Sequence, residues 1–312
     1  MDKKQLRIVF MGTPEISAYV FQAMIDDGYH FVGLIAQPDK PIGRKKEIVP
    51  VPTKVVALKH HIPVFQPLKI RLDYEFAKAL KPDVIVTLAY GQIVPQGLLD
   101  IPTHGCINLH GSLLPSLRGA SPMQYALIHG LKETGITLMQ MIDKMDAGLM
   151  YASRKVAVDP EETMTTLTEK FKVVAKELIL TELPHYIDGK LPGKSQDESL
   201  VTFAPLIKPD AEHLNLSLPV QSVVNWTRAL TDHPGGYLLD QDLKIKIYKA
   251  RVANTLVSAP VGTVVKADKD GLLIQGIDGQ MAILELQKEG RKRVDYKAFV
   301  NGNSGLLGGV LK

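Results

Sequence analysis

Short, continuous runs of apolar residues separated by helix-like segments are the feature that most restricts the fold of this chain. The first run is followed by a Gly-Thr-Pro turn and then by apolar residues at helical spacing, which predicts a strand, a turn and a helix. Strands without polar alternation are typical of a sheet buried on both faces. We therefore expect an α/β fold, with a Rossmann-like domain around a parallel or mixed sheet. The expected strands cover residues 6–11, 31–36, 84–88, 107–109 and 136–141, and the expected helices cover 16–27, 73–80 and 122–129.

The pattern of residues along the sequence changes after a long helix expected over residues 163–183. The following stretch carries Gly, Pro, Ser and Asp in quick succession, which is typical of a connection. Beyond it, short strands expected at 244–248, 262–266, 271–275 and 282–286 are separated by turns that include two Asp-Gly pairs suited to hairpins. A small β-barrel is the natural expectation. We therefore expect a catalytic domain over 1–189, a linker over 190–205 and a smaller β domain over 206–312.

The composition limits the class of protein. The 312 residues, 45% of them apolar, suffice for two domains with separate cores. A net charge of +4 permits an RNA partner but is far below that of proteins that coat nucleic acid. The single cysteine, Cys106, excludes an intrachain disulfide and fits a reducing compartment. The cytoplasm is therefore the expected location. No window holds the roughly 20 apolar residues that a membrane span needs, so we expect a soluble protein.

Asn108 and His110 lie two residues apart on an expected strand and therefore on the same face of the sheet. They are at the carboxyl end of that strand, where open α/β sheets bind ligands. An amide can donate hydrogen bonds to a developing oxyanion, and an imidazole can accept a proton near neutral pH. The pair suits a reaction through a tetrahedral carbon. An Asn-x-His pair is by itself a weak indication, since a lone histidine is more often structural.

A carboxylate beside His110 would fix the orientation of the imidazole and favour the imidazolium. Two candidates follow the strand expected at 136–141. Asp146 and Asp143 both lie in a polar break, and spacing alone does not separate them.

Residues 37–52 form a basic, proline-rich segment that is longer than an ordinary connection of about 2 to 6 residues between strand and helix. We interpret it as a loop. It either contacts a polyanion or is a solvated insertion, and the composition favours neither interpretation. Its cations are Lys40, Arg44, Lys45 and Lys46.

Other common sites are not indicated. The first turn, Gly12-Thr13-Pro14, lacks the glycine pattern of a dinucleotide site and the lysine of a P-loop. No cluster has metal-ligand spacing. Cys106 is expected to be a buried core residue.

The segment around Asn108 resembles a known family. Asn108, His110 and the turn 112–115, followed by Arg118-Gly119-Ala120, resemble the hallmark of the methionyl-tRNA formyltransferase family, and the resemblance extends along essentially the whole chain. The Met145-Asp146-Ala147-Gly148 setting resembles that of the family's distal aspartate, which favours Asp146 over Asp143.

The resemblance implies 10-formyltetrahydrofolate as the formyl donor and no metal. The implied acceptor is the free α-amino group of initiator methionyl-tRNA. In direct transfer, Asn108 would stabilise the oxyanion, and His110, oriented by Asp146, would relay the proton of the amine. Folate contacts are implied for the turn residues and for a second loop: Ser112, Leu113, Leu114, Pro115, Ala89, Tyr90 and Gly91.

The resemblance also implies a tRNA-binding surface. The basic segment is similar to an insertion used at the acceptor-stem end, and residues 206–312 resemble an OB-like RNA-binding barrel. The implied tRNA contacts are Lys40, Arg44, Lys45, Lys46, Arg291, Lys292 and Arg293. We expect a monomer.

The Asn, His and Asp core is shared with formyltransferases of other substrates, so a sugar nucleotide or another small amine is the alternative acceptor. An RNA-binding protein on a degenerate scaffold is a further alternative, against which the intact core speaks. The chain departs from the family pattern outside that core, and the departures concern the contacts of the linker and barrel with tRNA. They lie at Leu206, where a lysine is expected, at 214–216, and at 228–237, which lacks the expected aromatic residues.

Overall fold

The computed structural model describes residues 2–42 and 47–312 and divides into two compact units. The first unit contains the residues up to Pro122, together with Glu133–Ala157 and Thr168–Pro205. The second contains Leu206–Lys312 and two short segments of the preceding sequence, Met123–Lys132 and Val158–Leu167. Both segments lie within 1–189, the range that the sequence predicts as the catalytic domain.

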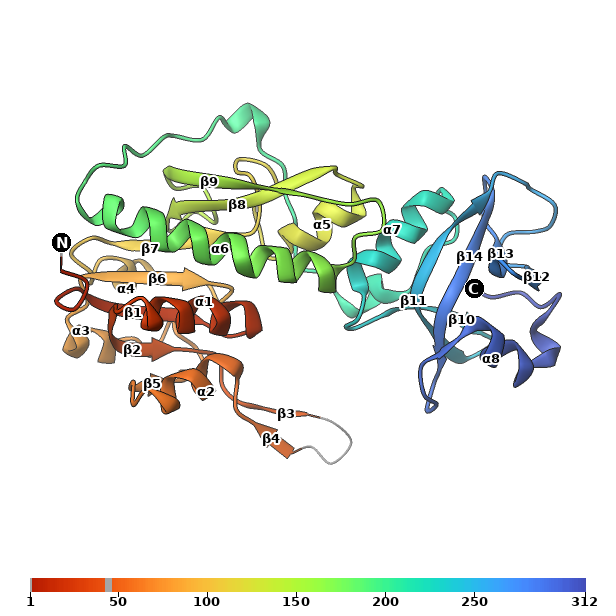
Figure 1. Ribbon diagram of the computed structural model, residues 1–312, viewed down its shortest axis with the longest axis horizontal. Helices are drawn as coiled ribbons and strands as arrows, with labels where there is room; N and C mark the ends of the chain where they lie inside the picture. Colours follow the sequence, from red (N-terminus) through yellow and green to blue (C-terminus); the bar gives the residue numbers. More distant parts are fainter. Residues whose placement is uncertain (1, 43–46) are drawn as a thin grey trace. The chain divides into compact units, whose positions relative to one another are not determined.

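A seven-stranded mixed sheet forms the first unit, in the order β5-β2-β1-β6-β7-β8-β9 (Figure 1). Neighbours from β5 to β7 are parallel, whereas β7–β8 and β8–β9 are antiparallel. The predicted α/β sheet is therefore confirmed. Its strands are β1 (Arg7–Gly12), β2 (His30–Ile35), β5 (Val64–Phe65), β6 (Val84–Leu88), β7 (Cys106–His110), β8 (Glu133–Gln140) and β9 (Met150–Ala157).

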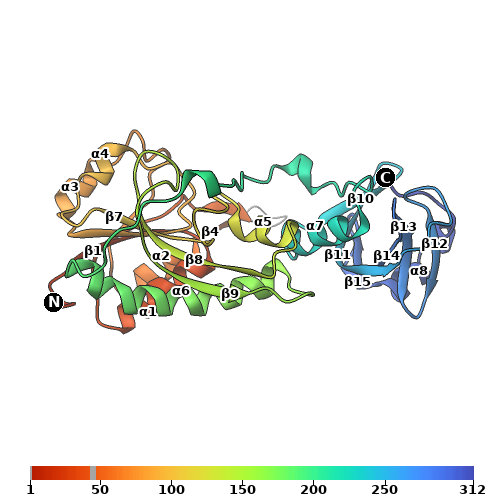
Figure 2. The ribbon, with the colours of Figure 1, turned by 90° about the horizontal axis from the view of Figure 1, so that it is seen from above.

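Helices cover both faces of this sheet, with α1 and α6 on one side and α3 and α4 on the other (Figure 2). Phe10 of β1 stacks on Phe21 of α1 with ring centroids 4.8 Å apart, while Val9 and Met11 belong to the core on the opposite face. Burial on both faces explains the unbroken apolar run. The helices are α1 (Glu15–Asp26), α2 (Pro52–Lys59), α3 (Phe76–Leu80), α4 (Gln96–Leu99), α5 (Pro122–Ile128) and α6 (Met164–Ile187).

The basic segment contains a hairpin, although the sequence predicts a loop there. Strands β3 (Lys40–Ile42) and β4 (Glu47–Val49) pair antiparallel, with Lys40 opposite Val49. Arg44, Lys45 and Lys46 lie outside the described residues.

The second unit is built on an antiparallel sheet in the order β10-β11-β14-β13-β12, with β15 paired to β14. This sheet confirms an antiparallel β domain, while its closure into a barrel stays a prediction. The helix α7 and the strand β10 were not predicted. The elements are α7 (Val220–Leu230), α8 (Tyr296–Asn301), β10 (Gly236–Asp240), β11 (Leu243–Asn254), β12 (Val264–Asp268), β13 (Gly271–Gln275), β14 (Gln280–Lys288) and β15 (Val294–Asp295).

Three short 3₁₀ turns complete the secondary structure: η1 (Glu198–Leu200), η2 (Pro209–Glu212) and η3 (Ser304–Leu306). Among the helices of the described residues, none combines the length and apolar character needed to cross a bilayer.

Candidate active site

Strand β7 carries Asn108 and His110 on one face, between β6 and β8. Because β6 and β7 are parallel, the loops that follow them leave the sheet at the same edge. Asn108 is half-buried, and its side-chain amide has no hydrogen-bond partner within residues 2–42 and 47–312. Its two N–H groups are therefore available to a ligand.

His110 is only 4% exposed, and protein groups face both of its ring nitrogens. Nε2 lies 2.9 Å from the carbonyl oxygen of Leu117, which can only accept, so Nε2 carries a proton. Nδ1 lies 3.6 Å from Oδ1 of Asp146. In the neutral ring Nδ1 is free to accept a proton, and in the imidazolium both N–H groups face an oxygen.

Asp146 lies in the connection between β8 and β9, with its backbone in the left-handed region at φ 49°. Its Oδ2 accepts a hydrogen bond of 2.8 Å from the backbone N–H of Gly119. Asp143, the other candidate, is exposed and accepts from the backbone N–H of Lys144. The structure thus places Asp146, and not Asp143, beside His110.

The turn after His110 is held from within by Thr137 of β8. The Thr137 hydroxyl donates to the Ser112 carbonyl oxygen at 2.8 Å and accepts from the Leu114 N–H at 3.1 Å. The Ser112 hydroxyl donates to the Ser116 carbonyl oxygen at 2.6 Å. Ser112 and Leu114 are buried, whereas Leu113 and Pro115 are half-buried. Leu113 and Pro115 are thus the side chains of this turn that a ligand can reach.

The loop after β6 exposes main-chain peptide groups at this edge of the sheet. Ala89 and Gly91 are exposed and have positive φ angles of 49° and 91°. Tyr90 between them is buried, and its carbonyl oxygen accepts hydrogen bonds from Thr13 and Gln37. Burial raises the pKa of the Tyr90 phenol to about 12, so the side chain is a neutral core group. A ligand at this edge would contact the peptide groups on either side of Tyr90.

The groups that hold the His110–Asp146 pair are not among the residues predicted from the sequence. Leu117 and Gly119 act through backbone atoms, which a sequence does not mark. Gly119 has φ 125°, and a Cβ there would lie 2.5 Å from the carbonyl oxygen of Ala204, so the position requires glycine. Gln196 lies in the expected linker and donates to the carbonyl oxygen of Asp146 at 2.8 Å. No feature of its sequence context indicated this contact.

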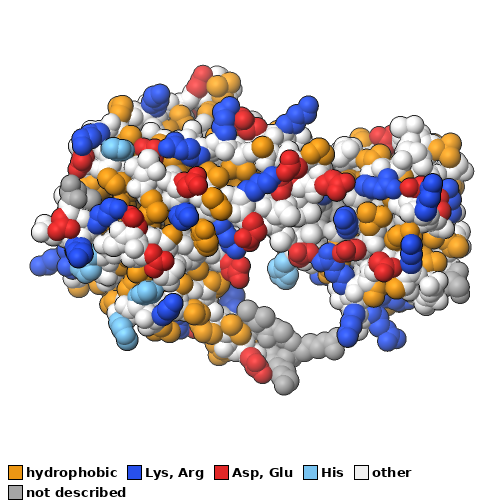
Figure 3. All heavy atoms as spheres, viewed as in Figure 1, with side chains coloured by type: hydrophobic (Ala, Val, Ile, Leu, Met, Phe, Trp, Pro, Cys, Tyr) orange, Lys and Arg blue, Asp and Glu red, His pale blue; other side chains and the backbone are white. Residues whose placement is uncertain are grey.

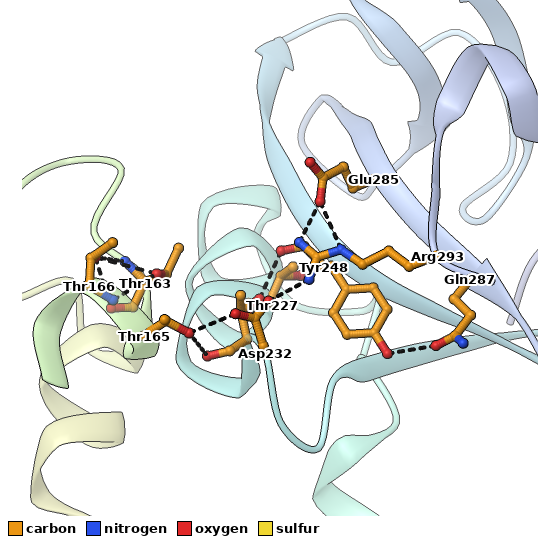
Figure 4. A network of polar contacts seen from close by, with 10 residues as sticks. Thr163, Thr165, Thr166, Thr227, Asp232, Tyr248, Glu285, Gln287 and Arg293 are labelled. Atoms are coloured by element: carbon orange, nitrogen blue, oxygen red, sulfur yellow. Dashed lines mark hydrogen bonds and ion pairs between the residues drawn. The ribbon is translucent and has the colours of Figure 1, made fainter. Parts of the chain in front are cut away.

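The predicted tRNA-contacting cations differ in availability. Lys40, Arg291 and Lys292 are exposed. Arg293 instead lies between acidic groups of the second unit (Figure 4). Its Nη1 donates to Asp232 at 2.5 Å, its Nε donates to Glu285 at 2.8 Å, and its guanidinium lies 4.4 Å from the ring centroid of Tyr248. The guanidinium of Arg293 is therefore engaged within the protein.

On the face of the molecule seen in Figure 3, Lys and Arg side chains lie among acidic ones, and no basic patch dominates that face. Within the described ranges, no group of three or more His, Cys, Asp or Glu side chains could hold a metal ion. Cys106 is buried, as predicted for a core residue, and this burial raises the pKa of its thiol to about 12, which disfavours the reactive thiolate.

Comparison with known families gives two matches. Residues 6–183 match the family described as "Formyl transferase", and residues 206–304 match "Formyl transferase, C-terminal domain". A methionyl-tRNA formyltransferase of Bacillus subtilis (strain 168) is 42% identical over 308 residues, covering 98% of this chain and 97% of the relative. One of Malacoplasma penetrans (strain HF-2) is 41% identical over 307 residues, covering 98% and 96%.

Solved structures share the fold at lower identity. The N-formyltransferase from Helicobacter canadensis, solved with folinic acid and dTDP-3-aminofucose, aligns with a TM-score of 0.69 at 16% identity over 91% of this chain and 100% of that one. HypX from Aquifex aeolicus in complex with tetrahydrofolic acid aligns with a TM-score of 0.67 at 16% identity over 95% and 47%. At such identity these likenesses establish the fold alone.

Proposed function

The chain belongs to the formyl transferase family, and we propose that it transfers the formyl group of 10-formyltetrahydrofolate to the α-amino group of initiator methionyl-tRNA. The observation that carries the proposal is the identity of 42% to a methionyl-tRNA formyltransferase along 98% of the chain. The proposed product is N-formylmethionyl-tRNA, which serves translation initiation. On the same ground we propose a cytoplasmic location.

The reaction begins when the amine attacks the formyl carbon, and a C–N bond forms as the carbonyl oxygen gains negative charge. Asn108 is the proposed donor to this oxygen, because neither N–H group of its half-buried amide has a partner among the described residues. A preorganised donor of this kind typically contributes about 10²- to 10³-fold in kcat. The bond to the folate nitrogen then breaks.

Overall, one proton leaves the amine and one is gained by the folate nitrogen that departs. His110 is the proposed relay for this proton. Its Nδ1 accepts the proton, since Nε2 is committed to the Leu117 carbonyl oxygen at 2.9 Å. The resulting imidazolium is stabilised by the Asp146 carboxylate, whose Oδ1 lies 3.6 Å from Nδ1. The proton then passes to the leaving nitrogen.

The folate donor is proposed to lie at the edge where β6 and β7 end. The exposed peptide groups of Ala89 and Gly91 offer hydrogen bonds to a polar ring, and Leu113 and Pro115 offer apolar contact. Tyr90, Ser112 and Leu114 are proposed to act by shaping these loops, because their side chains are buried or bonded internally. Holding donor and acceptor together can lower the barrier by about 7 to 11 kcal/mol in well-aligned systems.

For the tRNA, we propose phosphate contacts from the exposed Lys40, Arg291 and Lys292. Arg44, Lys45 and Lys46 are also proposed contacts, on the resemblance of their segment to the family's acceptor-stem insertion. The proposed domains are 1–189, 190–205 and 206–312, and the proposed state is a monomer.

A sugar nucleotide amine is the second candidate acceptor, because a structural neighbour was solved with dTDP-3-aminofucose. Purified protein should be given 10-formyltetrahydrofolate with either charged initiator tRNA or a dTDP-amino sugar. We expect formylation of the methionyl-tRNA at a far higher kcat/KM. Preference for the amino sugar would overturn the proposed acceptor, and no transfer to either would overturn formyl transfer.

A further inference from the structure

Residues 194–204, called the strap here, run across the two loops that hold the His110–Asp146 pair. At one end, Lys194 pairs with Met150 through two backbone hydrogen bonds of 2.9 Å. At the other, Arg118 donates to the Thr202 carbonyl oxygen at 2.9 Å, and Ala204 donates to the Arg118 carbonyl oxygen at 2.7 Å. The strap is thus fixed beside the Asp146 loop and beside residues 117–119, all within the first unit.

Gln196 is the strap residue that points into the Asp146 loop. It is half-buried, whereas its neighbours from 192 to 200 are exposed. Its Nε2 donates to the carbonyl oxygens of Asp146 and Gly148, at 2.8 and 2.9 Å, and its Oε1 accepts from Nε of Arg118 at 3.0 Å. Both amide donors and the amide oxygen are therefore used, and the partners fix the orientation of the group.

Gln196 holds Asp146 in a backbone conformation that is unfavourable without supporting contacts. Asp146 has a positive φ of 49°, a conformation uncommon for residues other than glycine, which persists where surrounding contacts impose it. The two bonds from Gln196 reach the carbonyl groups at both ends of the Asp146–Gly148 turn. They act on the main chain that carries the Asp146 carboxylate.

Arg118 connects Gln196 to the segment that holds the His110–Asp146 pair. Arg118 is 1% exposed and binds Gln196, and it also forms an ion pair with Glu198 through Nη2 and Oε1 at 2.8 Å. The residues on either side of Arg118 contact the pair directly, since the Leu117 carbonyl oxygen accepts from His110 and the Gly119 N–H donates to Asp146.

We propose that Gln196 is a positioning residue that holds Asp146 at its distance from Nδ1 of His110, so that the connection to the second unit helps to build the active site. The inference deepens the proposed formyl transfer and rests on it. Removal of the Gln196 donors should misplace the Asp146 carboxylate and slow the proton transfer, while substrate binding is kept.

Two substitutions separate this role from general folding. Gln196→Glu keeps an oxygen for Arg118 but replaces the donors to the Asp146 and Gly148 carbonyl groups by a second oxygen. Gln196→Ala removes all three contacts. The matched control is Glu198→Gln, which alters an exposed partner of Arg118 on the same strap and does not contact Asp146. Urea unfolding identifies variants that fold as the parent does.

We expect kcat to fall about 10- to 100-fold in both Gln196 variants, because a displaced Asp146 would cost part of the general acid–base catalysis by His110, which typically contributes about 10²- to 10⁴-fold. KM for donor and acceptor should stay within about twofold, as should kcat of Glu198→Gln. Parental kcat in a folded Gln196→Glu variant would overturn the proposal, and so would an equal loss in Glu198→Gln.

A readout without turnover distinguishes this inference from the proposed function. The ¹⁵N chemical shifts of the His110 ring report the environment of each ring nitrogen, and they should change in Gln196→Glu but not in Glu198→Gln. If the parent protein has no formylation activity, the proposed function fails and these shifts still decide the inference. Unchanged His110 shifts in Gln196→Glu would contradict it.

Discussion

Nδ1 of His110 lies 3.6 Å from Oδ1 of Asp146, while the Leu117 carbonyl oxygen holds Nε2 of the same ring at 2.9 Å. The shorter contact fixes the ring, and the longer one leaves Nδ1 as the position that can gain a proton. The carboxylate thus faces the nitrogen that becomes charged in the proposed transfer, and not a nitrogen that is already protonated.

Substitution of Asp146 tests this relationship. Asp146→Asn keeps the shape and an oxygen for the Gly119 N–H but removes the negative charge beside Nδ1. We expect kcat to fall about 10- to 100-fold, because part of the general acid–base catalysis by His110 is lost, with little change in folate affinity. Steady-state kinetics and fluorescence titration measure the two quantities. The matched control is Asp143→Asn, because Asp143 is exposed and does not contact His110. A similar loss in both variants would argue against a specific role for Asp146.

Asn108 should stabilise the transition state more than it stabilises the bound formyl donor. Asn108→Ala removes the two amide donors at the end of β7, and we expect kcat to fall about 10²- to 10³-fold while KM for the donor changes little. Asn301→Ala, at the exposed end of α8, serves as a control and should have the parental rate. A rise in KM at constant kcat would instead assign Asn108 to ground-state binding.

The sequence predicted those parts of the site that depend on side-chain chemistry and strand geometry. Asn108 and His110 could be paired because residues two apart share a face of a strand, and β7 confirms that placement. The orienting role of the Leu117 carbonyl could not be predicted, since every residue has a carbonyl group. Gln196 could not be predicted because its partners are brought to it by the fold.

The same limit applies to the fold. Strands buried on both faces, such as β1 and β6, have continuous apolar runs and were predicted to within a residue or two. The hairpin of β3 and β4 was missed because its strands are three residues long and exposed at β4. The helix α7 was missed although one of its faces packs into the core of the second unit through Val220, Val223 and Val224.

The cations at the end of β14 should divide into two functional groups. Replacing Arg291 and Lys292 by alanine should raise KM for tRNA and weaken its salt dependence, because phosphate contacts are lost. Arg293→Ala should mainly lower the free energy of unfolding, by about 1 to 2 kcal/mol, since Arg293 pairs with Asp232 and Glu285 and lies over Tyr248. Urea unfolding and kinetics at several salt concentrations would separate the effects. A selective effect of Arg293→Ala on tRNA KM would contradict this division.

Asp232 should make stability depend on pH in the acid range. The hydrogen bond from Arg293 lowers the pKa of Asp232 below its ordinary value of 3.8. Because the folded pKa is depressed, this contribution is present above the unfolded pKa and is lost as the pH falls through the folded pKa. The unfolding free energy of the parent should exceed that of Asp232→Asn at pH 7, and the difference should shrink below about pH 4. A difference that is constant with pH would exclude the ion pair as its source.

The most direct test of formyl transfer follows the carbon itself. A single turnover with 10-formyltetrahydrofolate carrying a ¹³C-formyl group and charged initiator tRNA should be analysed by mass spectrometry after the aminoacyl ester is hydrolysed. We predict that the label is recovered in N-formylmethionine in amounts equal to the folate donor consumed. Recovery of the label as free formate, with unmodified methionine on the tRNA, would contradict direct transfer to methionyl-tRNA.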